Sequence, residues 1–284
     1  MIKNLTEGKP LKLLFFFSLP MLMGNLFQQL YNMVDSIVVG NFVGADALAA
    51  VGASFPVVFL AVALASGLSM GCNVVISQLF GAGRIREMKT TISTALIGQF
   101  IYNTLNGIYN ALGDSKTPLY FLMLSTLTNI VLDLLFVIKF HMGVAGVAWA
   151  TLIAQGVCAG LSMVVIMARL KHLGKRPLFH FSAVERIARI GVPSMIQQSI
   201  VSVSMLMMQG LVNSYGSVFI AGYTAATKID SLAMMPNMNF SNAMSSYTAQ
   251  NIGAGKIERV KDGYKANMFM VVVFSGIITL IIFL

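Results

Sequence analysis

The stretch QLFGAGRIREMK at residues 78–89 decides the fold, because it recurs as QNIGAGKIERVK at residues 250–261. Ordered internal repeats are common in secondary transporters, where the substrate path lies between the repeated halves. The repeat therefore predicts two lobes that arose by duplication. Two further pairs of segments match in the same order and at nearly the same spacing, namely 18–29 with 191–202 and 42–53 with 214–225.

Composition places these lobes in a membrane. Hydrophobic residues make up 57% of the 284-residue chain, charged residues only 10%, and the mean hydropathy is +0.79. A soluble domain carries about 25% charged residues. Because the apolar stretches show no strand-like alternation, we expect an all-α, polytopic membrane helix bundle. The stretches that reach the roughly 20 residues needed to span a bilayer are 11–40, 46–80, 117–140, 142–168, 187–213, 217–250 and 264–284.

The net charge of +9 comes from basic residues in the gaps between the apolar stretches. They cluster near the N-terminus and at 84–89, 169–189 and 256–265. An excess of Lys and Arg in cytoplasmic loops is the usual positive-inside pattern of membrane proteins. No basic motif interleaved with aromatic residues accompanies it, so we expect the lipid bilayer as a partner and no nucleic acid.

The sequence carries no pattern typical of an enzyme or of a metal cofactor. Cys72 and Cys158 lie inside apolar stretches, which favours packing over a disulfide or a metal site. His141, His172 and His180 lack the spacing of metal ligands. Phosphate-binding loops, nucleophile elbows and zinc motifs are not found in the sequence. We therefore expect neither catalysis nor a bound cofactor.

The repeat and the basic gaps divide the chain into three parts. We expect an N-terminal helical lobe at 1–168, a basic cytoplasmic linker at 169–186 and a partial C-terminal helical lobe at 187–284. The segment 90–112 is shorter and more polar than the other apolar stretches. A single crossing there would place the basic linker on the wrong side of the membrane. We therefore expect that 90–112 makes no simple crossing and is re-entrant or interfacial.

Two acids lie within apolar stretches, where charge is costly and usually functional. Asp35 follows a polar face formed by Gln28, Tyr31 and Asn32 at helical spacing. Asp133 lies one helical turn after Asn129. Two carboxylates from different helices, surrounded by amides and hydroxyls, predict a binding site for a proton or a sodium ion. The alternative is that each acid lies near a helix end or caps a neighbouring helix.

The second copy of the repeat does not reproduce this acidic position. Met207 and Met208 stand where the first copy has Asp35. The ion site is therefore predicted in the first lobe alone. The second lobe instead has a polar face that either bonds helix to helix or contacts substrate, and its residues are Gln198, Ser202, Gln209 and Asn213.

These motifs together resemble the multidrug and toxic compound extrusion (MATE) family. Members of that family are antiporters that expel cationic or amphipathic organic compounds in exchange for protons or sodium. They have two bundles of six helices around a central cleft. The matching segments, in order, are LPMLMGNLFQQLYNMVDSIVVG (19–40), QLFGAGR (78–84), GDSKTPLY (113–120), TNIVLDLLF (128–136), GVAGVAWATLIAQ (143–155), IGVPSMIQQ (190–198) and QNIGAGK (250–256).

The resemblance implies roles for individual residues. The family's cation site corresponds to Asp35, Asn129, Asp133 and Thr151, and these four are the expected sodium ligands if the coupling ion is sodium. No other metal and no cofactor is implied. The expected substrate cavity is lined by Gln28, Tyr31, Asn32, Asn106 and Gln198.

The chain departs from the family pattern at two places. The first lobe lacks the end of the family's third helix and the start of its fourth, next to 90–112, and the second lobe stops before its last helices. We expect a multi-pass antiporter of the inner membrane that exports organic cations or drugs. One alternative is a non-transporting remnant or partner subunit that assembles with a second copy as a homo-oligomer. The other is a flippase for lipid-linked oligosaccharides, which the acidic character of the membrane-embedded charges disfavours.

Overall fold

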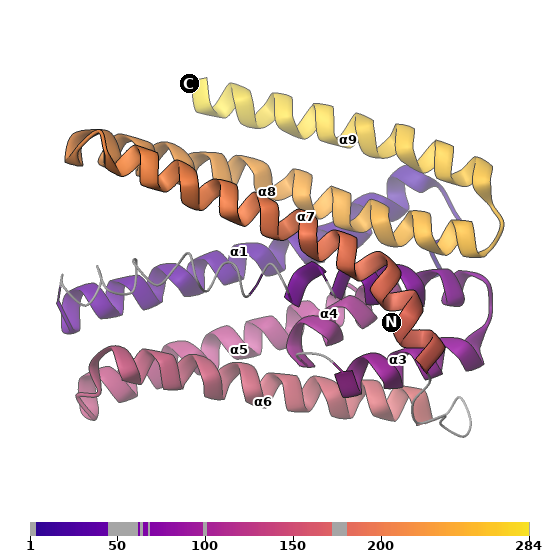
Figure 1. Ribbon diagram of the computed structural model, residues 1–284, viewed down its shortest axis with the longest axis horizontal. Helices are drawn as coiled ribbons and strands as arrows, with labels where there is room; N and C mark the ends of the chain where they lie inside the picture. The colour runs from indigo at the N-terminus through magenta and orange to yellow at the C-terminus, as the bar shows by residue number, and fades with distance from the viewer. Residues whose placement is uncertain are drawn as a thin grey trace.

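The computed structural model describes residues 4–44, 62, 65–67, 69–98, 101–171 and 181–283. Within those ranges the regular structure is entirely helical, which confirms the predicted all-α bundle. The helices lie roughly along one long axis (Figure 1). Their bounds are α1 (Pro10–Phe42), α3 (Ile85–Gly98), α4 (Ile101–Ala111), α5 (Lys116–Leu134) with the π-helical turn η1 (Leu135–Lys139), α6 (Gly143–Lys171), α7 (Phe181–Asn213), α8 (Ser217–Gly253) and α9 (Ile257–Phe283); residues 69–81 are also helical.

Five of these helices are long and apolar enough to cross a membrane. They are α1, α5 with η1, α6, α7 and α9. Helix α8 is longer still, at 37 residues, but it is less apolar than the others. Helix α1 contacts α5 and also α8 and α9, so this helix of the first lobe borders the second lobe.

The sequence repeat is also a structural repeat. Helices α1 and α7 each have 33 residues and contain a proline at the matching position, Pro20 and Pro193. Both GAG motifs end a helix through a glycine with positive φ, +68° at Gly83 and +71° at Gly255. A residue in this left-handed conformation is the usual C-terminal stop of a helix, and glycine adopts it without steric cost.

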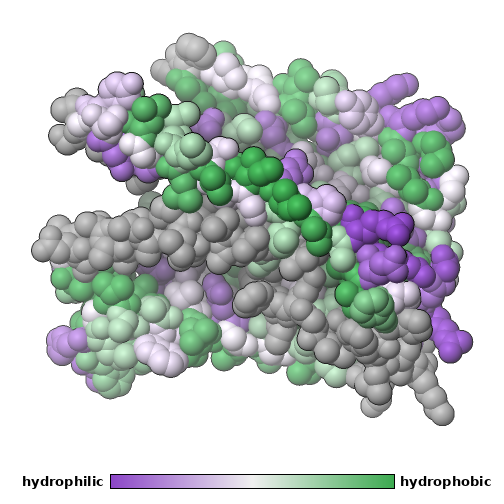
Figure 2. All heavy atoms as spheres, viewed as in Figure 1, coloured by the Kyte–Doolittle hydropathy of each residue, from purple (hydrophilic) through white to green (hydrophobic). Residues whose placement is uncertain are grey.

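One end of the bundle carries most of the basic residues, and we call it the basic end. It contains the N-terminal lead (residues 4–9), the GAG turns and the turn at 112–115. Figure 2 shows strongly hydrophilic side chains over this end of the visible face. The basic residues there are Lys9, Lys12, Arg84, Arg86, Lys89, Arg169, Arg186, Arg189, Lys256, Arg259, Lys261 and Lys265.

The turn at 112–115 is tied to α6 by a buried acid. The Asp114 carboxylate accepts bonds from the Thr117 N–H (3.1 Å) and hydroxyl (2.7 Å), which caps the start of α5. Arg169 on α6 donates to the same carboxylate at 2.6 Å. Burial by itself would raise the pKa of Asp114, but the bonds from Arg169 and Thr117 outweigh burial and hold this pKa below its usual value.

The segment 90–112 falls within two short helices, α3 and α4, of 14 and 11 residues. Gln250 lies against the backbone at Gly81, four residues before α3, and also donates to the Ala111 carbonyl (2.8 Å) at the end of α4, so both of these positions lie at the basic end. That 90–112 makes no simple crossing stays a prediction. Helix α4 packs into the main apolar core, where Tyr109 is fully buried.

The expected linker is only partly described. Helix α6 continues to Lys171 and α7 begins at Phe181, so both ends of the range 169–186 are helical. Residues 172–180 lie outside the described part of the chain, as do residues 45–61 at the start of the predicted second span. The division into lobes at 168 and 187 stays a prediction.

Candidate cation site

Three helices of the first lobe bring the predicted acidic residues together. Helix α1 supplies Asp35, α5 supplies Asn129 and Asp133, and α6 supplies Thr151. Helices α1, α5 and α6 contact one another, so residues far apart in sequence meet between them. Asn129 and Asp133 share one face of α5 because they are a single helical turn apart.

Asn129 lies at the centre of the site. With its amide nitrogen toward the acids, it donates to Asp133 Oδ2 (3.0 Å) and to Asp35 Oδ1 (3.2 Å), and its oxygen accepts from the Thr151 N–H (3.2 Å). The reverse orientation would set the amide oxygen against two carboxyl groups, so the hydrogen-bond network assigns this one. One amide therefore links all three helices.

Tyr31 completes the network from α1. Its hydroxyl lies 3.0 Å from the Thr151 hydroxyl, and either group can be the donor. Tyr31 is one turn before Asp35 on α1, which places both side chains on the helix face that meets α5 and α6.

The two acids have no basic partner. The Asn129 amide bridges their carboxyl groups, and none of the ion pairs among the described residues involves Asp35 or Asp133. Asp133 is fully buried, and its Oδ1 has no hydrogen-bond partner. Two facing carboxylates cannot both stay charged in a buried site without a compensating positive charge. The site therefore requires a shared proton or a bound cation.

A small polar cavity adjoins the site. Its volume is about 20 Å³, roughly enough for one water molecule or a small ion. Sequence analysis missed Ser125 and Gln155 as members of this lining, although each is one helical turn from a predicted residue, Asn129 and Thr151 respectively. The cavity is lined by Gln28, Tyr31, Leu122, Ser125, Thr126, Asn129, Thr151, Ala154 and Gln155.

The expected substrate-cavity residues divide into two groups. Gln28 and Tyr31 line this cavity, whereas Asn32, Asn106 and Gln198 are not among its lining residues. Asn32 is exposed, because the step of about 100° from Tyr31 turns it off the face that meets α5. Asn106 is on α4 and Gln198 is exposed on α7, so both belong to helices outside the α1–α5–α6 contact.

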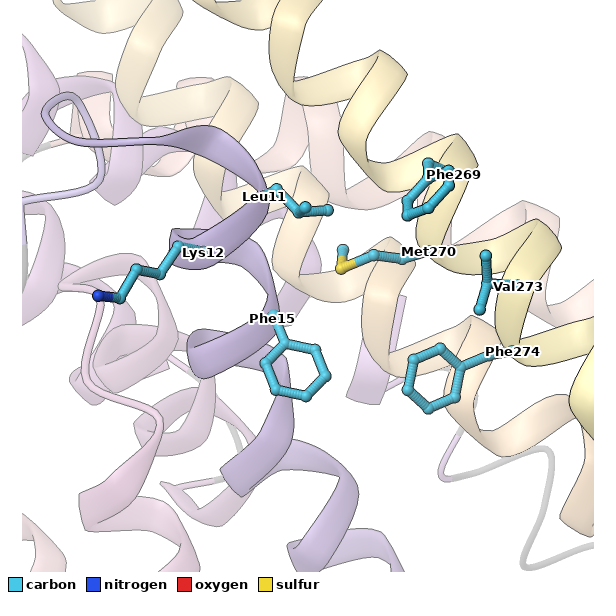
Figure 3. Close-up of a pocket in the computed structure, with 7 residues that line it drawn as sticks. All are labelled: Leu11, Lys12, Phe15, Phe269, Met270, Val273 and Phe274. Carbon is cyan, nitrogen blue, oxygen red and sulfur yellow. The ribbon is translucent and has the colours of Figure 1, made fainter.

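A second cavity, larger than the one beside the acids, lies elsewhere. Its volume is about 300 Å³, and Figure 3 shows it between α1 and α9. Its only charged lining residue is Lys12, whose side chain points away from the others in that view. The remaining lining residues are Leu11, Phe15, Phe269, Met270, Val273 and Phe274. None of the side chains that line this cavity offers a cation an oxygen ligand.

The chain is similar in sequence to known drug-resistance proteins. It is 29% identical to the probable multidrug resistance protein YpnP of Bacillus subtilis, over 90% of this chain and 68% of that protein. It is 25% identical to the probable multidrug resistance protein NorM of Thermotoga maritima, over 94% of this chain and 68% of that protein. The YpnP alignment covers 309 positions, more than the 284 residues of the chain, so the relative has internal segments that this chain lacks.

The fold is similar to that of solved transporters. The structure matches one described as the outward-facing conformation of a multidrug resistance MATE family transporter of the MOP superfamily, with a TM-score of 0.86 and 26% identity. A second match, MATE in the straight conformation, has a TM-score of 0.85 and 26% identity. Each match covers 95% of this chain and 72% of the solved one.

The MatE family model matches residues 20–98 and 193–284, which is more than half of the chain. The first matched range stops at Gly98, where the sequence pattern also departs from the family. These relatives are transporters and not enzymes, and MATE transporters are multi-pass membrane proteins. The chain therefore belongs to the MATE family of multidrug transporters.

Proposed function

We propose that this protein is an antiporter of the cytoplasmic membrane that exports organic cations or amphipathic drugs in exchange for a small cation. The observation that carries the proposal is the pair of facing acids, Asp35 and Asp133, which Asn129 bridges and which form no ion pair with any described basic residue. Such a pair is stable only when a positive charge accompanies it. The charge requirement is the physical basis for exchange.

The exchange follows from electrostatics. When a proton or sodium ion is bound, the two acids attract it and α1 stays close to α5. When it leaves, the carboxylates repel each other across the interface of these helices. An organic cation that approaches through the cavity at Gln28 and Gln155 offers the same positive charge, so substrate and coupling ion compete for one negative site. Because the substrate and the coupling ion compete for this site, export of the substrate is coupled to entry of the ion.

The side chains suit a hard, oxygen-seeking cation. The available ligands are the carboxylates of Asp35 and Asp133 and the hydroxyls of Tyr31 and Thr151, all of them oxygens. The unpartnered Oδ1 of Asp133 is the atom best placed to receive a proton or to contact a sodium ion. Proton and sodium coupling both fit this set, and the experiment below separates them.

The orientation in the membrane follows from charge. We place the basic end in the cytoplasm, because Lys and Arg are retained on that side of the membrane. The resemblance to an outward-facing solved structure supports the same orientation, with the lobes joined at the cytoplasmic end. In this arrangement the acidic site is reached from the side opposite the basic end.

The test is efflux from proteoliposomes driven by either a pH gradient or a sodium gradient. Asp35→Asn and Asp133→Asn remove one charge each without changing side-chain size, and we expect efflux of a cationic dye to fall to the background of empty liposomes. Asp262→Asn is the matched control, because Asp262 is exposed at the basic end and should leave efflux unchanged. Efflux that stays at the wild-type rate in both acid variants would refute the assignment.

A further inference from the structure

The two repeated turns touch each other backbone to backbone at the basic end. A Cβ atom added to Gly81 would lie 1.9 Å from the carbonyl oxygen of Gln250. A Cβ atom added to Gly253 would lie 2.0 Å from the carbonyl oxygen of Gln78. In the sequence repeat, Gln78 corresponds to Gln250 and Gly81 corresponds to Gly253. We call this contact the crossing; it joins the helix at 69–81 to α8, and it has no room for a side chain.

A single buried amide reinforces the crossing. Gln250 is fully buried, and its Oε1 accepts the Leu5 N–H at 2.9 Å. Its Nε2 donates to the Ala111 carbonyl at 2.8 Å. Gln250 therefore bonds the second lobe to two separate segments of the first, the N-terminal lead and the end of α4.

The N-terminal lead is held in place by the second lobe. Asn251, Lys256 and Arg259, all at the α8–α9 turn, donate side-chain hydrogen bonds to backbone carbonyls of the lead. Leu5 is buried beneath these bonds, in the cluster that also contains Tyr247. The bonds join Asn251 to Leu5 (3.2 Å), Lys256 to Thr6 (3.1 Å) and Arg259 to Gly8 (2.8 Å).

Two further polar contacts join the lobes away from the turns. Next to the crossing, Ser246 on α8 donates to Asn73 at 3.2 Å. Midway along α1, Asn25 donates to Asn239 at 3.1 Å. The contacts named here therefore extend from the basic end to the middle of α1.

We propose that the crossing is the cytoplasmic gate of this transporter, and that Gln250 holds it closed. This inference rests on the proposed antiport function, since antiport requires the path to open at the cytoplasmic side. Opening there must separate both glycine–carbonyl contacts and break both hydrogen bonds of Gln250. The glycines permit a closed state with no gap between backbones, and the buried amide sets how often that state opens.

The first experiment measures how often the gate opens. In a background with Cys72→Ala and Cys158→Ala, Ser77→Cys places a reporter thiol at a fully buried position one turn from the crossing. Its rate of labelling by a membrane-impermeant maleimide is measured in inside-out vesicles. Loss of two buried neutral hydrogen bonds in Gln250→Ala should raise this rate on the order of tenfold. Gln209→Ala is the matched control, because the Gln209 side chain donates to Asn213 on its own helix.

A glycine pair tests the backbone contact in the same assay. Gly253→Ala puts a methyl group against the Gln78 carbonyl and should increase labelling of the reporter. Gly276→Ala adds the same methyl group on α9, where nothing lies within 4 Å, and should leave labelling unchanged. Wild-type labelling in both Gln250→Ala and Gly253→Ala would overturn the proposal. If Gly253→Ala does not accumulate in the membrane, the Gln250 variant decides alone.

The second experiment asks whether the gate must open for transport. The pair Asn73→Cys and Ser246→Cys is joined by a short reducible thiol cross-linker. The cross-link connects the helix at 69–81 to α8 next to the crossing. We expect cross-linking to stop efflux and reduction to restore it. The control pair is Asn237→Cys with Ser275→Cys, which bond at 3.1 Å within the second lobe and should tolerate the same cross-link.

The two experiments separate failure of the gate from failure of the proposed function. Efflux that continues through a fully cross-linked Asn73–Ser246 pair overturns the gate. A cysteine-free parent without efflux contradicts the antiport function, and the labelling rates, which need no transport, still decide whether Gln250 controls opening.

Discussion

Among the ion pairs of the described residues, the one between Asp114 and Arg169 has the most deeply buried carboxylate. Asp114 has only 1% of its side chain exposed and Arg169 has 32%, and their closest atoms are 2.6 Å apart. We predict that Asp114→Asn lowers the free energy of unfolding by about 2 kcal/mol. A hydrogen bond to a charged group contributes about 1.5–3 kcal/mol to stability. We take a value below the top of this range because solvent partly screens Arg169.

The assay is thermal unfolding in detergent, followed by the fraction of protein that still elutes as a monodisperse peak. A loss of about 2 kcal/mol corresponds to a fall in Tm of roughly 4–8 °C for a chain of this size. The Asn variant keeps the shape of the side chain, and Arg169 keeps its contact with the Tyr109 ring at 5.6 Å from the ring centre. Glu185→Gln is the control, since its ion pair with Arg189 is exposed and should contribute less than about 1 kcal/mol.

The same pair predicts a pH dependence with a definite sign. The pKa of Asp114 is lower in the folded protein than in the unfolded chain. Its ionised form therefore stabilises the protein fully above the unfolded pKa of about 3.9, and this stabilisation is lost as pH falls through the lower folded pKa. The Tm difference between wild type and Asp114→Asn should be constant near neutral pH and should shrink as pH drops below about 4. A variant with wild-type Tm at pH 7, or a difference that grows in acid, would refute this reasoning.

Three further predictions concern other contacts. Asn129→Ala leaves the two acids without their bridging donor and should weaken cation-driven efflux about tenfold, measured as the sodium or proton concentration that gives half-maximal efflux. Tyr31→Phe keeps the ring but removes the hydroxyl that bonds Thr151 beside the acids, so it should shift the same midpoint by a smaller factor, whereas Tyr264→Phe at an exposed position should not. Glu87→Gln removes exposed bonds to Arg84 and Arg186 and should change the unfolding free energy by less than about 1 kcal/mol, so a Tm fall above roughly 5 °C would contradict it.

Much of the cation site follows from helical periodicity. Asp35 with Tyr31, and Asp133 with Asn129, are one turn apart, so each pair must share a helix face whichever way the helices pack. The same rule would have identified Ser125 and Gln155, which are one turn from Asn129 and Thr151. Periodicity failed for Asn32. The polar face predicted from Gln28 to Asp35 covers more of the helix surface than the face that α1 presents to α5.

The gate residues could not be predicted in the same way. Gly81 and Gly253 are recognisable in the repeat as helix-ending GAG turns, but nothing local indicates that each faces the backbone of the other copy. The pairing of Asp114 with Arg169 could not be predicted from the sequence either. Asp114 lies just before the start of α5 and Arg169 lies near the end of α6, so the two are far apart along the chain.

The sequence by itself determined that this protein is a duplicated bundle of membrane helices, where those helices end and which polar residues share a face. Those properties depend on apolar length, on glycine at the turns and on a 3.6-residue period, all of which act within a few residues. Only the tertiary structure decided that the Asp35 and Asp133 carboxyls meet through Asn129, and that Gly81 faces the Gln250 carbonyl while Gly253 faces the Gln78 carbonyl. Contacts of this kind depend on the angle and distance at which whole helices pack, which are set by all of their side chains together.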